Sequence, residues 1–75
     1  VNVYPNPSNG NFVVSLAEAM PIQILEVYDM NGKKVLEMSP ETESVNLQLQ
    51  GYAKGVYMVK LYSENGLGTS KVVIE

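Results

Sequence analysis

The side chains able to do chemistry are eight carboxylates, five lysines, five tyrosines and several serines and threonines, because the chain has no histidine, cysteine, tryptophan or arginine. Without histidine there is no ordinary general base near neutral pH, and without cysteine there is no thiolate nucleophile. A serine could instead be activated by a lysine, and Ser70 precedes Lys71. Neighbours on a strand point to opposite faces, so this pair would not meet. We therefore expect no enzymatic activity.

The carboxylates do not form a recognisable catalytic or metal-binding pattern. Glycoside hydrolysis needs two acids across a cleft, and a calcium loop needs oxygen ligands at alternating positions. Asp29-Met30-Asn31-Gly32 begins like such a loop but continues with two lysines, which favours a hairpin turn. No glycine-rich phosphate loop precedes a helix, so we expect neither a metal nor another cofactor. The acids lie at predicted turns and outward strand positions: Glu18, Glu26, Asp29, Glu37, Glu41, Glu43, Glu64 and Glu75.

Size and charge limit the chain to a small globular domain. Its 75 residues carry a net charge of −3, which argues against nucleic acid as a partner. The composition is 45% hydrophobic and 17% charged, as in folded domains, and scaling predicts a folded surface of roughly 4,500 Å². The first residue is Val1 rather than methionine, so we expect residues 1–75 to be one domain of a longer protein.

Apolar residues recur with a period of two, which predicts strands. Residues 17–20 are the one helix candidate and are too short to be stable alone. Several short strands at this spacing predict an all-β fold, a small antiparallel sandwich or barrel. The predicted strands cover residues 1–4, 11–16, 22–29, 33–38, 44–49, 56–62 and 69–75.

Asparagine, glycine and proline mark the connections between these strands. Asn31-Gly32 predicts a type I′ hairpin turn, and Asn65-Gly66 predicts a second, longer hairpin loop. The prolines in residues 5–10 predict a rigid turn that no sheet can cross. Residues 22–29 have apolar groups on both faces, which fits either a central strand covered on both sides or a strand that carries a bulge.

The tyrosines leave two alternative functions open. A row of exposed aromatic rings would suit a carbohydrate-binding or adhesive module, whereas tyrosine is also common within strands and at sandwich rims. A passive spacer within an extracellular protein is the other alternative. The tyrosines are Tyr4, Tyr28, Tyr52, Tyr57 and Tyr62.

Four short motifs follow one another along the chain: VYPNPSNG at 3–10, VYDMNGKKV at 27–35, GVYMVK at 55–60 and TSKVVIE at 69–75. In these motifs and their order the chain resembles the C-terminal sorting domains of type IX secretion systems, in the type A family of Bacteroidetes. The motif residues that we expect to matter for recognition are Pro5, Asn6, Pro7, Gly10, Gly32, Lys33, Gly55, Tyr57, Lys60, Lys71, Val72, Val73, Ile74 and Glu75.

The resemblance implies an immunoglobulin-like sandwich of seven antiparallel strands that sorts a preceding cargo domain. It further implies passage through the periplasm, export by an outer-membrane translocon, and removal by a sortase-like cysteine protease at the cell surface. The cargo is then released or joined to anionic lipopolysaccharide. Because exposed strand edges can pair with other strands, we also consider a homodimer of the isolated domain.

Pairing at an exposed strand edge also suggests how the export machinery recognises the domain. We expect the export machinery to bind the last strand, residues 71–75, by strand addition. We expect Pro5, Pro7 and Gly10 to act through the fold, because they set the first turn.

Overall fold

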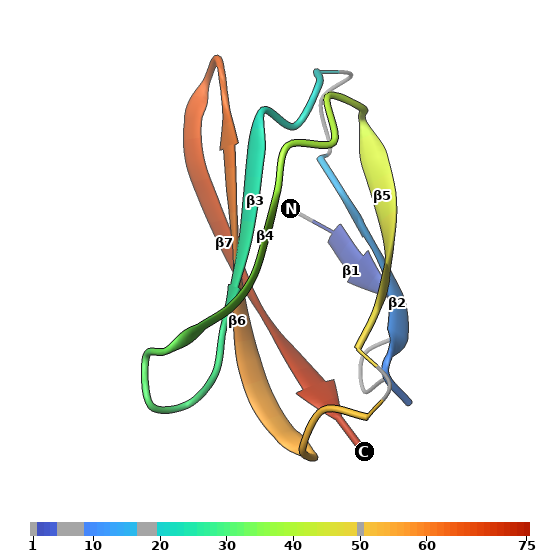
Figure 1. Cartoon of the computed structure of the whole chain (residues 1–75). Helices are drawn as coiled ribbons and strands as arrows, with labels where there is room; N and C mark the ends of the chain where they lie inside the picture. The colour runs from blue at the N-terminus through green and yellow to red at the C-terminus, as the bar shows by residue number, and fades with distance from the viewer. Residues whose placement is uncertain (1, 5–8, 17–19, 50) are drawn as a thin grey trace.

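The computed structural model describes residues 2–4, 9–16, 20–49 and 51–75, which form two antiparallel sheets (Figure 1). One sheet has the order β1-β2-β5 and the other the order β4-β3-β6-β7. No helix occurs within these ranges, and the candidate at 17–20 falls largely outside them. The strands are β1 (Asn2–Tyr4), β2 (Asn11–Ser15), β3 (Ile24–Tyr28), β4 (Lys34–Met38), β5 (Ser44–Gln48), β6 (Gly55–Ser63) and β7 (Gly66–Ile74).

This strand order is a variant of the immunoglobulin arrangement. In a constant-type immunoglobulin domain the first, second, fifth and fourth strands form one sheet, and the third, sixth and seventh form the other. Here β4 pairs with β3 instead of β5, so the fourth strand has moved to the opposite sheet. The all-β sandwich of seven strands is confirmed, and its accessible surface of 4496 Å² agrees with the value expected from chain mass.

The inward positions of both sheets supply one hydrophobic core. On β2, Phe12 and Val14 are buried, and on β3, Leu25 and Val27 are buried, with less buried residues between them. This alternation is what the period of two predicts, because successive strand residues face opposite sides. The buried core consists of Phe12, Val14, Ile22, Leu25, Val27, Leu47, Leu49, Tyr57, Val59, Leu61, Val72 and Ile74.

The segment predicted as a strand over 22–29 is shorter, because its first residues are not part of the ladder. Ile22 is fully buried but precedes β3, and alternation begins at Ile24. The strand is central, between β4 and β6, and a register shift on its β4 side leaves Val35 between two paired residues. The segment is therefore a central strand, but it is not covered on both faces, since Ile24 is 39% exposed, and the extra residue of the bulge, Val35, belongs to β4.

The first hairpin turn differs from the predicted type I′. The amide of Gly32 donates to the carbonyl of Asp29 at 3.1 Å, which makes Met30 and Asn31 the central residues of the turn. Among the described residues, Glu41 is the one non-glycine with a positive φ, so Asn31 does not adopt the left-handed conformation. Gly32 does, at φ 81°. The connection is a three-residue hairpin loop with glycine in the left-handed position, which costs glycine no steric clash.

The second hairpin is tighter than predicted. Ser63 pairs with Gly66, so the loop is the two residues Glu64 and Asn65, and Leu67 and Gly68 lie within β7. The expectation that β7 begins at residue 69 is wrong, because a single positive φ of 114° at Gly66 completes the turn and lets pairing resume at once. The ends of β2, β4, β5 and β6 either coincide with the predicted ends or differ from them by one residue.

Gly32 gives a direct test of this turn. Its φ of 81° disfavours any side chain, and a Cβ placed there would meet no atom within 4 Å. Gly32→Ala should therefore destabilise the domain through backbone strain alone, by about 1 kcal/mol. In a domain of this size that loss lowers Tm by roughly 4–8 °C.

Gly32→Asn is the matched control, because asparagine tolerates the left-handed conformation better than alanine. Its Tm should lie between those of the wild type and Gly32→Ala. Equal Tm values for all three proteins, measured by thermal unfolding, would contradict the conformation assigned to this turn.

Candidate recognition site

The residues of the first motif are only partly within the described chain. Pro5, Asn6 and Pro7 lie outside the described residues. Gly10 is buried with φ 112°, and its carbonyl accepts a hydrogen bond from the amide of Leu49 at 2.6 Å. This hydrogen bond links the residue before β2 to the residue after β5. Because a positive φ favours glycine, the conformation of Gly10 fits a role in the fold.

The second motif is organised by Asp29, which sequence reasoning did not select as a site residue. One carboxylate oxygen, Oδ1, accepts hydrogen bonds from the amides of Asn31 at 2.9 Å and Lys33 at 3.0 Å. The amide of Asp29 in turn donates to the carbonyl of Lys33 at 2.9 Å. An aspartate side chain commonly accepts a hydrogen bond from the backbone amide two residues further on in a turn, so the sequence contained the clue. The turn thus holds Gly32 and Lys33 in place, and both residues are exposed.

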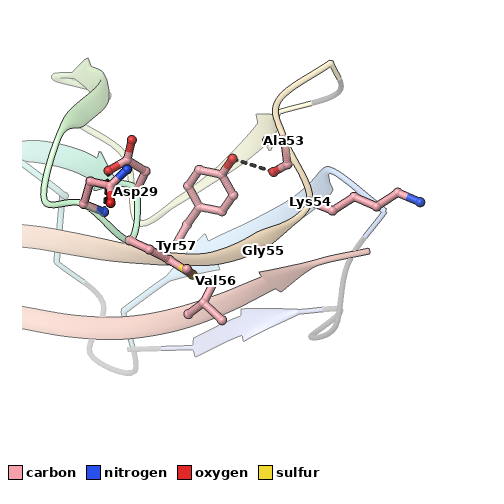
Figure 2. A pocket seen from close by; sticks show the side chains of 8 residues that line it. Asp29, Ala53, Lys54, Gly55, Val56 and Tyr57 are labelled. Atoms are coloured by element: carbon pink, nitrogen blue, oxygen red, sulfur yellow. Dashed lines mark hydrogen bonds between the residues drawn. The ribbon is translucent and has the colours of Figure 1, made fainter.

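The third motif contains a buried tyrosine that fixes the start of β6. The Tyr57 ring is 6% exposed, and its hydroxyl donates to the carbonyl of Ala53 at 2.5 Å (Figure 2). The ring also meets the edge of Tyr52, with 6.5 Å between centroids. A hydroxyl bonded to backbone just upstream of its own strand is the tyrosine-corner arrangement of immunoglobulin-like sandwiches. Tyr57 therefore belongs to the fold, and Gly55, at φ 150°, lies in the same corner.

A shallow pocket of about 190 Å³ lies between the second and third motifs. Figure 2 shows the Lys54 side chain pointing away from Asp29, whose carboxylate already accepts the turn amides. Among the described residues, no group of three acids could hold a metal ion. Asp29 is the one acid among the described residues that line the pocket, so these residues offer no pair of carboxylates. Its lining consists of Asp29, Met30, Asn31, Ala53, Lys54, Gly55, Val56 and Tyr57.

The fourth motif alternates between the core and the outer face of the four-stranded sheet. Val72 and Ile74 are buried, Val73 is half-buried, and Lys71 is exposed. Glu75 follows the strand and is exposed. β7 is the last strand in the order of its sheet, and it also contacts β1 of the other sheet. Val72 and Ile74 therefore serve packing, whereas Lys71 and Glu75 lie on the surface.

The outer face of the four-stranded sheet carries a polar network centred on Glu26, which sequence reasoning treated as ordinary surface. The Tyr28 hydroxyl donates to Glu26 Oε1 at 3.1 Å, and Lys34 Nζ lies 3.4 Å from Oε2. Lys34 also pairs closely with Glu37. Desolvation raises the pKa of Glu26, but hydrogen bonds from Tyr28, Tyr62 and Lys34 outweigh it and hold that pKa below its usual value. Glu26 is therefore ionised on this face at neutral pH.

The structure brings Lys60 and Lys71 to this same outer face. Lys60 lies opposite Glu26 on the neighbouring strand, and its Nζ is 4.8 Å from the centroid of the Tyr28 ring. Lys71 lies opposite Met58, which in turn lies opposite Tyr28. Residues from the last three motifs, which are far apart in sequence, are therefore neighbours on β3, β6 and β7.

The tyrosines do not form the aromatic row that a sugar-binding platform would need. Tyr4 on β1 is 54% exposed and Tyr52 is 38% exposed, but they belong to different parts of the sandwich. Tyr57 is in the core, and Tyr28 and Tyr62 are half-buried beside Glu26. Within the described chain, nothing favours the carbohydrate-binding alternative.

Comparison with known proteins identifies the family. The family model described as "Secretion system C-terminal sorting domain" matches residues 2–75. Beta-agarase A from Zobellia galactanivorans is 30% identical over 71 residues, which cover 95% of this chain but 13% of the agarase. The motifs predicted the same family, and with it export to the cell surface or beyond. The chain belongs to the family of secretion system C-terminal sorting domains, which sort proteins into type IX secretion.

Proposed function

We propose that this chain is the sorting tail of a larger cargo protein and carries no catalysis of its own. The match of the sorting-domain family to residues 2–75 is the observation that carries this proposal. An outer-membrane translocon binds the folded domain, and a sortase-like cysteine protease at the cell surface then separates it from the cargo. The identity with a short part of a much longer agarase supports a cargo attached to the domain.

The interactions that three of the carboxylates make support the non-catalytic role. Asp29 is used by turn amides, and both Glu26 and Glu37 are bound by Lys34. A glycosidase would instead need two carboxyl groups about 5–10 Å apart across a cleft. These three acids serve local structure, which fits a domain that is recognised and later removed.

We also propose that the end of β7 takes part in recognition by the machinery. β7 is the last strand in the order of its sheet and exposes Lys71, but it also contacts β1, so binding by strand addition stays a prediction. The four-stranded sheet also ends at β4, and the other sheet ends at β1 and β5. A homodimer through such edges stays a prediction, which sedimentation of the purified domain can measure.

Deletion of residues 71–75 from a cargo–domain fusion should abolish its export, measured as cargo in the medium or on the cell surface. Val72 and Ile74 are core residues, so deletion also weakens packing. The double variant Val72→Ala/Ile74→Ala is therefore the control, because it loses core contacts but keeps the strand end. At a temperature where the double variant is folded, its export should persist. Normal export of the truncated fusion would contradict a role for this strand.

Tyr57→Phe separates folding from recognition in the third motif. The variant keeps the ring and loses the hydrogen bond to Ala53, which should cost about 1 kcal/mol and lower Tm by roughly 4–8 °C. Tyr52→Phe is the matched control, because its hydroxyl makes an exposed bond of 3.3 Å to Val35, and its Tm should change less. Both variants should be exported while folded. An unchanged Tm with lost export would mean that the Tyr57 hydroxyl is read directly.

A further inference from the structure

The outer face of the four-stranded sheet combines apolar groups with positive charge. Ile24 on β3, Val56 on β6 and Leu67 on β7 are 39%, 37% and 57% exposed. Ile24 and Leu67 both lie opposite Tyr62, and Val56 lies opposite Val73. Half of the six large hydrophobic residues exposed among the described residues are therefore on this one face. We call it the β3-β6-β7 face.

The centre of this face is a cross-strand row. Tyr28, Met58 and Lys71 lie side by side in register on the three strands. The Lys60 ammonium group lies over the ring of Tyr28. In the β3–β6 pairing, Lys60 lies directly opposite Glu26. Because the aromatic ring restrains the Lys60 ammonium, less side-chain freedom is lost when a partner binds it. The row therefore presents a partly ordered cationic group beside apolar atoms.

Charge distinguishes this face from the rest of the molecule. The outward positions of the four-stranded sheet hold three lysines and two glutamates, although the whole chain has a net charge of −3. The strands of the other sheet, β1, β2 and β5, contain no charged residue. The positive charge on strands is thus confined to one side of the sandwich. On the strands, a partner with negative charge would therefore meet its complement on this side.

We infer that the β3-β6-β7 face is the docking surface for a protein of the export machinery, whose own surface is apolar and flanked by carboxylates. This inference rests on the proposed sorting function and assigns it a surface. Aromatic and aliphatic groups at the centre with charges around them are typical of protein interfaces. An anionic membrane fits less well, because lipid surfaces attract clusters of four to eight basic residues. Here Glu26 and Glu37 remain among the lysines.

The test compares charge reversals in a cargo–domain fusion expressed with its export machinery. Lys71→Glu places a negative charge at the centre of the face and should lower the exported fraction about tenfold, the ratio that corresponds to 1.4 kcal/mol of binding free energy. Lys54→Glu makes the same change in net charge at an exposed loop position off the face, and its export should match the wild type. Tm values of the purified fusions establish that both variants are folded.

A second pair of variants tests the apolar part. Leu67→Ser removes an exposed apolar group from the face and should also reduce export, whereas Met30→Ser removes one that is 74% exposed in the first hairpin turn and should not. Equal export of Leu67→Ser and Met30→Ser, or of Lys71→Glu and Lys54→Glu, would overturn the inference.

The remaining outcomes separate this inference from the proposed function. If the wild-type fusion is not exported, the sorting function itself fails. If deletion of residues 71–75 stops export but folded Lys71→Glu and Leu67→Ser are exported normally, the sorting function stands and the assigned face is wrong. The purified fusions are also mixed with phosphatidylglycerol–phosphatidylcholine vesicles. Vesicle binding by the wild type that Lys71→Glu abolishes would identify a membrane surface and overturn the protein partner.

Discussion

The packing of two sheets against one shared core is the constraint on which the rest of this domain depends. The chain has no cysteine and no histidine, so neither a disulfide nor a histidine-ligated metal can compensate for a weak core. A domain of this size buries only about 60% of its unfolded surface, which leaves little excess stability. Every long strand therefore contributes its inner face to packing, and in β6 and β7 this includes Tyr57, Val59, Val72 and Ile74.

This constraint explains why each family motif mixes two kinds of residue. Because strand residues alternate between faces, a contiguous motif necessarily includes both core and surface positions. In the last motif, Val72 and Ile74 are buried, whereas Lys71 is exposed. The residues of one sequence motif therefore do not form one continuous patch on the surface. The surface that such motifs share becomes visible only when the strands are placed side by side.

The sequence was sufficient for the architecture, but it was ambiguous for turns and silent on register. The period of two predicted seven strands because burial on one face leaves a direct trace in the residue types. Asn31-Gly32 misled the turn assignment because both residues tolerate positive φ, and only the bond from Gly32 to Asp29 shows which one adopts it. The proximity of Lys60 to Tyr28 depends on β3 pairing with β6, which the chain order does not reveal. The family, in contrast, was recognisable because its motifs are local in sequence.

The two outer faces of the sandwich differ in a way that packing does not require. Either outer face could carry charge without disturbing the core, yet β1, β2 and β5 carry none, and the strand lysines all lie on the opposite sheet. A domain that only needed solubility would gain from charge on both faces. An uneven distribution instead gives the sandwich an orientation that a partner can detect, since like charges repel wrong approaches and opposite charges favour the correct one. For a domain whose role is to be recognised, the placement of lysine on one sheet is therefore the feature of the surface that most needs a functional explanation.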